Sequence, residues 1–155
     1  MSAPTPEERL AELGLTLPEV ATPLAAYVPA LRTGDYVYTS GQLPVVDGKL
    51  AVTGKVGAEV SAEDAKELAR ICALNALAAV KSVVGDLSKV VRIVKVVGFV
   101  ASAPDFTGQP VVVNGASELL GEVLGDAGRH ARSAVGVASL PLDASVEVEV
   151  IAEVR

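Results

Sequence analysis

The chain has 155 residues, of which 50% are hydrophobic, and a formal net charge of −6 at pH 7. This length suits one domain that buries roughly 70% of its unfolded surface, and the negative charge excludes the broad basic surface typical of nucleic-acid-binding proteins. A single cysteine and a single histidine exclude an internal disulfide and argue against a metal held by protein ligands, so we expect neither metal nor cofactor. An uninterrupted apolar run of about twenty residues is absent from the sequence, which leads us to expect a cytoplasmic protein with no membrane partner.

The N-terminal segment 1–23 is predicted to be an extension of the domain formed by residues 24–155. Thr5 is a suitable N-cap and Pro6 a suitable first residue for a short helix, which Gly14 would end. This extension carries no candidate site residue.

The first half of the domain is predicted to contain strands followed by a long helix. The stretch YVPALRTGDYVYTSGQLPV, residues 27–45, indicates two strands joined by a hairpin turn at TGD. A short strand is expected at residues 50–52, and a helix at residues 61–84. Nearly every residue in the centre of that helix is apolar, with Asn75 as the exception, so the helix should be covered on more than one side.

The second half is predicted to contain three strands and one helix. Residues 89–101 are almost continuously apolar and β-branched, as in a strand buried on both faces. A helix is expected at residues 109–125, and strands at 131–139 and 145–154. This order predicts an α+β two-layer sandwich, in which two long helices cover one face of a mixed sheet of about six strands.

Alternation along the last two strands divides their residues between two faces. The valines should pack under the helices, Val135 and Val137 among them. The opposite face of strand 131–139 carries an arginine and small residues: Arg132, Ala134, Gly136 and Ala138. A hairpin closing at Leu142–Asp143 would bring Arg132, Glu147 and Glu149 together on the face away from the helices, provided that the register holds.

Two interpretations of this second face remain open. It could simply be solvated, as in many antiparallel sheets. Alternatively, because only two helices are available to cover a sheet with two partly apolar faces, another subunit could cover it. Small residues would then leave room for a ligand, and Arg132 could hold an anion with two parallel hydrogen bonds.

Three segments resemble the RidA/YjgF family of small homotrimeric proteins with a chorismate-mutase-like fold. They are YVPALRTGDYVYTSGQLPV, PDFTGQPVVVN and ARSAVGVASLPLDASVEVEVIA. The resemblance covers about residues 24–155, and the N-terminal extension and the longer DGKLAVTGKVGAEV loop indicate a distinct, longer branch. It implies a homotrimer whose sites lie in clefts between subunits.

The resemblance also implies roles for individual residues. Arg132 would hold a substrate carboxylate, and Glu147 would orient the water that attacks an imine carbon. The remaining matches would line the cleft: Tyr27, Ser40, Gly41, Asn114 and Ala134. The implied activity is hydrolysis of enamine or imine intermediates, such as 2-aminoacrylate, to a 2-keto acid and ammonia. Imines hydrolyse readily in water, so orientation of the substrate and the water can suffice.

Two positions depart from the family pattern. Ala134 stands where the best-studied deaminases have cysteine, and His130 stands where proline is common. His130 is a further candidate for catalysis, although a histidine at the start of a strand is usually structural. Asn114 and Gly115 break the helix preference of their segment, either for close helix packing or for a site role of Asn114.

Three functions therefore follow from the sequence. The first is an imine deaminase acting on small imino acids. The second is a non-catalytic sensor that binds small carboxylates or ketoacids. The third is a ribonuclease or translation inhibitor, which the acidic net charge disfavours.

Overall fold

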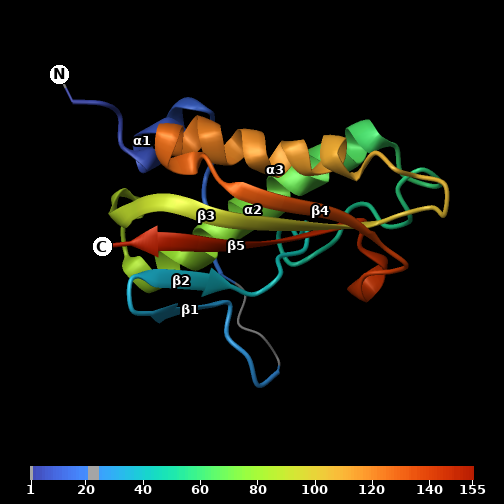
Figure 1. Ribbon diagram of the computed structural model, residues 1–155, viewed down its shortest axis with the longest axis horizontal. Coiled ribbons are helices and arrows are strands. Elements are labelled where there is room, and N and C mark those ends of the chain that lie inside the picture. Colours follow the sequence, from blue (N-terminus) through green and yellow to red (C-terminus); the bar gives the residue numbers. More distant parts are fainter. Residues whose placement is uncertain (1, 21–24) are drawn as a thin grey trace.

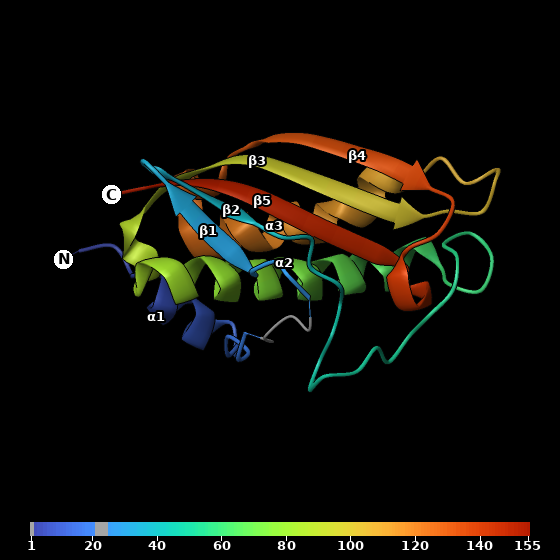
Figure 2. The same cartoon turned by 90° about the horizontal axis from the view of Figure 1, so that it is seen from below.

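The computed structural model describes residues 2–20 and 25–155, and within them the chain forms a single five-stranded sheet with helices on one face (Figures 1 and 2). The helices and strands follow in the order α1 (Pro6–Glu12), β1 (Ala30–Thr33), β2 (Tyr36–Thr39), α2 (Ala62–Val84), β3 (Val90–Ala101), α3 (Gln109–Leu124), β4 (Ala131–Val137) and β5 (Val146–Val154). The α+β class and the two long helices are as predicted. No helix of the described residues has both the length and the apolar character needed to cross a membrane.

The sheet has five strands because residues 50–52 form none, contrary to expectation. Just before these residues, an isolated bridge joins Val46 and Lys49 across a two-residue turn. Asp47 and Gly48 adopt positive φ angles in this turn, 51° and 79°, as a tight hairpin turn requires. The hairpin therefore ends before residue 50, and the chain continues as a loop to α2.

The predicted hairpin between the last two strands is wrong. The strand order is β1-β2-β5-β3-β4, so β3 lies between β5 and β4. β4 runs parallel to β3, and β5 runs antiparallel to both β3 and β2. Because α3 connects β3 to β4, the chain returns to the same end of the sheet and can form the parallel pair. The short link after β4 then leads to the place of β5 in the middle of the sheet.

The register overturns the prediction of which side chains face the helices. Val96 pairs with Arg132 on β4 and with Val150 on β5, and both valines are buried in the core. Arg132 therefore lies on the helix face. Phe99 pairs with Val135 and with Glu147, so Val135 faces away from the helices and is 43% exposed. The glutamates lie on the open face as expected, but without Arg132.

Close approach of α3 explains the small residues of β4. A Cβ at Gly98, the neighbour of Ala134 across the strands, would collide with the side chain of Val113 on α3. A Cβ at Gly136 would meet the side chain of Gln109, 2.8 Å from its Nε2 atom. Ala134 itself packs against the hydrophobic core. Small size at these positions thus lets a helix pack close to the sheet.

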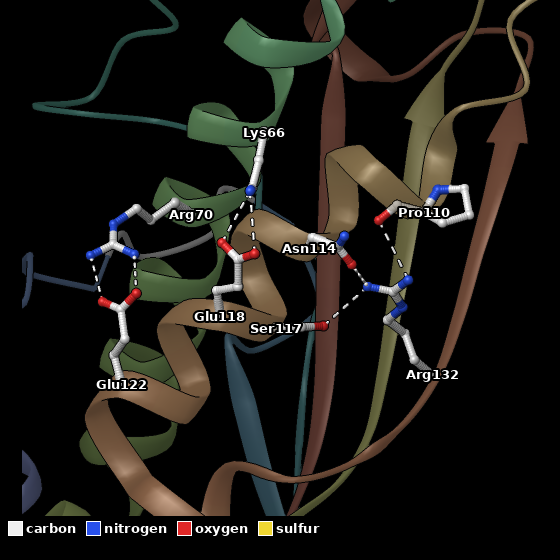
Figure 3. A network of polar contacts seen from close by, with 8 residues as sticks. All are labelled: Lys66, Arg70, Pro110, Asn114, Ser117, Glu118, Glu122 and Arg132. Atoms are coloured by element: carbon white, nitrogen blue, oxygen red, sulfur yellow. Dashed lines mark hydrogen bonds and ion pairs between the residues drawn. The ribbon is translucent and has the colours of Figure 1, made fainter.

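The two long helices are in direct backbone contact at Gly115. A Cβ there would overlap the carbonyl oxygen of Lys66 on α2. Ion pairs also join the helices, with the Nζ atom of Lys66 3.1 Å from Glu118 and the Nη2 atom of Arg70 3.0 Å from Glu122 (Figure 3). The close-packing interpretation of Gly115 is confirmed.

Gly115→Ala is expected to lower the free energy of unfolding, because the new methyl group forces the two helices apart. Overpacking of this kind costs about 1–3 kcal/mol, more than the gain of about 1 kcal/mol from alanine's helix propensity. Gly121 on the same helix is the matched control, since nothing lies within 4 Å of the place that a Cβ would take there. Gly121→Ala should stabilise by up to about 1 kcal/mol. Chemical denaturation measures both, and equal effects would contradict the contact.

The N-terminal helix α1 is part of the packed structure. Thr5 caps it, with its Oγ1 accepting from the backbone N–H of Glu8 while the Glu8 carboxylate accepts from the N–H of Thr5. Leu10 is buried in the core, and Glu7 accepts a hydrogen bond from the backbone N–H of Leu87. The predicted boundary at residues 23–24 lies outside the described residues.

Candidate functional site

Arg132 reaches from β4 to the first turns of α3 (Figure 3). Its Nη1 atom donates to Asn114 Oδ1 at 2.8 Å and to Ser117 Oγ at 3.3 Å, and its Nη2 atom donates to the carbonyl oxygen of Pro110 at 3.4 Å. All three acceptors are neutral. No ion pair involves Arg132 among residues 2–20 and 25–155. The half-buried guanidinium is therefore held in place while its charge remains available to an anion.

His130 belongs to the same network but does not contact Arg132. Its Nδ1 atom lies 2.6 Å from the carbonyl oxygen of Gly128, and its Nε2 atom lies 2.9 Å from Ser117 Oγ. A carbonyl oxygen can only accept, so Nδ1 carries a proton, and in the neutral imidazole Nε2 accepts from the Ser117 hydroxyl. The Ser117 oxygen is then free to accept from Arg132. His130 thus orients Ser117, which in turn helps to orient Arg132.

Glu147 lies on the open face of the sheet, where β5 passes the chain that follows β2. A Cβ at Gly41 would collide with the Glu147 carboxylate, so a larger residue there would displace this side chain. Partial burial raises the pKa of Glu147 above its ordinary value, and the nearby charge of Glu149 raises it further. The structure therefore holds a carboxylate that binds a proton more readily than a solvated glutamate.

Tyr27, Ser40 and Gly41 line a cavity of about 600 Å³ at the end of β2. The Ser40 hydroxyl donates to the carbonyl oxygen of Val28 at 2.6 Å, which joins the end of β2 to the segment before β1. Tyr27 is 59% exposed. Gly41 connects this group with Glu147, because its backbone lies beside both the cavity and the carboxylate.

The candidate residues thus form two groups on opposite faces of the sheet. Arg132 and Asn114 lie together on the helix side, whereas Glu147 lies on the open side near Gly41. The expectation that Arg132 and the glutamates share one face is wrong, because the register places Arg132 level with the core residues Val96 and Val150, whereas Glu147 is level with Phe99 on the other face. Ala134 lies on the helix side beneath α3, in contact with the core.

Ser117 is the residue of this site that the sequence interpretation missed. It stands three positions after Asn114, a spacing that places both side chains on one face of a helix. A polar pair on the face of a largely apolar helix was the available signal. Among the described residues, no group of three or more His, Cys, Asp or Glu side chains is arranged to hold a metal ion.

Comparison with known families and proteins identifies similar sequences over nearly the whole chain. Residues 7–154 match the family model described as "YjgF/chorismate_mutase-like, putative endoribonuclease". "Protein TCP17" of Trypanosoma cruzi is 44% identical over 147 residues, covering 94% of this chain and 92% of that protein. The 2-iminobutanoate/2-iminopropanoate deaminase of Salmonella typhimurium is 38% identical over 129 residues, covering 83% and 88%.

Solved structures are similar to this chain in sequence and fold as well. A protein of unknown function from Agrobacterium tumefaciens is 54% identical and superimposes with a TM-score of 0.91, covering 97% of this chain and 92% of that one. TdcF of Escherichia coli, solved with bound serine, is 27% identical with a TM-score of 0.65, covering 88% and 94%.

Proposed function

Since the chain belongs to the YjgF/RidA family, we propose that it hydrolyses small imino acids to 2-keto acids and ammonia at sites formed between copies of the chain. The deaminase relative, 38% identical, supports this reaction class. The serine bound in TdcF supports a small amino-acid-like ligand. A cytoplasmic location stays an expectation from the sequence.

The observation that carries the proposal is the state of Arg132. Its guanidinium is oriented by Asn114, Ser117 and Pro110, yet no carboxylate of the described residues neutralises it. A half-buried cation without a partner is costly unless a ligand supplies the negative charge. The planar carboxylate of an imino acid supplies it with two parallel hydrogen bonds.

In this proposal a second copy of the chain supplies the Glu147 carboxylate that Arg132 lacks beside it within its own copy. The open face of the sheet carries exposed aromatic and aliphatic side chains that would favour association: Leu31 at 50%, Tyr36 at 42%, Tyr38 at 43% and Val135 at 43%. Arg132 and Glu147 lie on opposite faces within a copy, so a shared site needs Arg132 of one copy beside Glu147 of the next. A homotrimer, as in the family, closes this arrangement with three equivalent sites.

In the proposed reaction the carboxylate of the imino acid binds Arg132 and the imine carbon faces a water held by Glu147. Glu147 accepts the water proton as the new C–O bond forms, and the electron pair of the C=N bond moves to nitrogen. The proton passes from Glu147 to that nitrogen and gives a carbinolamine. Glu147 then takes the proton of the new hydroxyl group and passes it to the same nitrogen, so that ammonia leaves as the C–N bond breaks and the C=O bond of the 2-keto acid forms. One water is consumed for each ammonia released, and no covalent enzyme intermediate is needed.

A non-catalytic sensor is the second candidate, favoured by Ala134 at the position where related deaminases have cysteine. Such a protein would use the same Arg132 to bind a small carboxylate. The family description names an endoribonuclease; the net charge of −6 disfavours binding to a phosphate backbone.

The test generates 2-iminobutanoate in situ with an amino-acid oxidase and follows ammonia and 2-ketobutyrate with and without the protein. We expect the protein to accelerate both at equal rates, and sedimentation equilibrium to give a trimer at micromolar concentration. Carboxylate binding without acceleration would favour the sensor. A stable monomer that is fully active would contradict sites formed between copies.

A further inference from the structure

The nitrogens of the Arg132 guanidinium differ in what they contact (Figure 3). Nη1 carries two hydrogens and has two part-buried acceptors, Asn114 Oδ1 at 2.8 Å and Ser117 Oγ at 3.3 Å. Nη2 has one acceptor, the carbonyl oxygen of Pro110 at 3.4 Å in an exposed contact, and the Nε–H has none among the described residues. While Asn114 and Ser117 occupy Nη1, the Nε–H and one Nη2 hydrogen remain for a ligand.

The Ser117 hydroxyl can serve Arg132 only if it keeps one orientation. A hydroxyl has a single hydrogen and rotates to suit its neighbours. Within a helix, serine commonly turns that hydrogen back to a carbonyl oxygen of the preceding turn. Ser117 on α3 instead has the Nε2 atom of His130 at 2.9 Å, which in the neutral imidazole takes the hydroxyl hydrogen. The contact with His130 therefore fixes a side chain that would otherwise be free to rotate.

His130 is itself held by the turn Gly125–Gly128, which follows α3. Its Nδ1 atom lies 2.6 Å from the carbonyl oxygen of Gly128, and this contact sets the tautomer of the ring. Gly128 is buried and packs so closely on α3 that a Cβ there would collide with the carbonyl oxygen of Leu120. Helix α3 thus anchors Gly128, Gly128 orients His130, and His130 orients Ser117. Proline, which is common in the family at this position, has no side-chain group for either contact.

We propose that His130 is a positioning residue for the substrate carboxylate. Through Ser117 it keeps Nη1 of Arg132 occupied, and so it holds the Nε and Nη2 edge of the guanidinium toward the ligand. This inference rests on the proposed function, which places the imino-acid carboxylate on Arg132. His130 takes no part in the proton transfers assigned to Glu147. Its effect should therefore appear in carboxylate affinity and vanish when Ser117 lacks its hydroxyl.

His130→Asn and His130→Gln form the matched pair for the test, because the two side chains differ by one methylene group. Asparagine can still donate to the carbonyl oxygen of Gly128 but is too short to reach Ser117, whereas glutamine can place its amide oxygen near the site of Nε2. Calorimetric titration with 2-oxobutyrate should give about fivefold weaker binding for His130→Asn. His130→Gln should retain most of the affinity.

A double-mutant cycle with Ser117→Ala tests whether His130 acts through Ser117. Residues of one hydrogen-bond network are not additive, so the double variant His130→Asn/Ser117→Ala should bind no more weakly than Ser117→Ala alone. Arg129→Gln is the control, since it removes an exposed charge next to His130 that forms no ion pair within residues 2–20 and 25–155. Its small effect on affinity should be the same with and without the Ser117 hydroxyl.

Nitrogen-15 NMR of the ligand-free protein gives a readout that does not depend on the proposed function. The ring proton of neutral His130 should lie on Nδ1 in the original protein. The Nη1 and Nη2 atoms of Arg132 should give separate signals, because their hydrogen bonds restrict rotation of the guanidinium. This rotation should become faster in His130→Asn and in Ser117→Ala, and in the double variant no faster than in Ser117→Ala.

Additive losses in the cycle, or a His130→Asn protein that binds 2-oxobutyrate like the original, would overturn this inference. Normal hydrolysis of 2-iminobutanoate by the original protein would then leave the proposed function standing. Coupled losses of binding, with no hydrolysis of 2-iminobutanoate by the original protein, would support the positioning role and overturn the proposed function. If the original protein binds no 2-oxobutyrate, the proposed function is overturned, and equal rotation of Arg132 in the original and His130→Asn proteins would overturn the positioning role as well.

Discussion

Arg132→Lys is expected to lower the affinity for pyruvate-like and 2-oxobutyrate-like acids about 100-fold, and imine hydrolysis by a similar factor. Lysine keeps the charge but cannot form two parallel hydrogen bonds to a carboxylate. Its single ammonium also cannot maintain the contacts of Arg132 with Asn114, Ser117 and Pro110 at once. Charged hydrogen bonds are worth about 1.5–3 kcal/mol each, which corresponds to this loss. Calorimetric titration and ammonia release measure the two effects.

A structural role is the rival explanation, because Arg132 also ties β4 to α3. Oligomeric state and thermal stability of the variant separate the two roles. Ser117→Ala is the companion variant, since it removes one of the guanidinium's acceptors and keeps the charge and the bond to Asn114. It should weaken carboxylate binding only several-fold. An Arg132→Lys protein that binds and turns over like the original would contradict the anion-binding role.

Glu147→Gln is expected to reduce kcat for imine hydrolysis about 100-fold or more, while binding of a 2-keto acid changes little. Glutamine keeps the shape and still accepts a hydrogen bond, but it cannot take the proton of the attacking water. Loss of a general base costs about 10²–10⁴ in rate. Glu149→Gln, on the same face of β5, is the matched control and should retain most of the activity. Equal loss of binding and turnover in Glu147→Gln would instead indicate a structural role.

The raised pKa of Glu147 also predicts the pH dependence. The carboxylate must be ionised to accept a proton, so kcat/KM should rise with pH through a value above the ordinary glutamate pKa of about 4.3. Glu149→Gln should move this limb to lower pH, because the charge of Glu149 contributes to the upward shift. A limb at or below the ordinary value, unmoved in that variant, would contradict the assignment.

The raised pKa of Glu147 also predicts how the free energy of unfolding changes with pH. The folded protein holds the Glu147 proton more tightly than the unfolded chain, so the free energy of unfolding decreases as pH rises from the ordinary pKa through the raised one. Glu147→Gln should remove this contribution. The difference in denaturation midpoint between the two proteins should therefore change across that interval of pH.

Local patterns predicted the elements of this fold well. The length and apolar character of α2 and β3 allowed both to be placed within a residue or two of their observed bounds, because these properties depend on neighbouring residues alone. The partners of the strands were harder to predict. The pairing of β5 with β3 joins segments far apart in the chain, and a hairpin of β4 with β5 satisfied the same local pattern.

Local pattern also could not predict which face of β4 lies under the helices. The alternation of side chains along the strand correctly placed Arg132 and Val135 on opposite faces of the sheet, but it could not tell which of the two residues lies under a helix. The small residues of β4 admit either a ligand or a closely packed helix, and only the position of α3 decides between them. For the site, Arg132 and Asn114 were linked through family resemblance, and the structure adds the hydrogen bond that connects them.

The central position of β5 has a consequence for the order of folding. β5 follows every other strand of the sheet in sequence, yet it is the strand that joins the pair β1–β2 to the pair β3–β4. During synthesis on the ribosome, these two pairs can form separately, but the edges that β5 later fills stay unpaired until it emerges. The nascent chain therefore depends on a late, long-range step, and this interval is when aggregation or chaperone binding should be greatest.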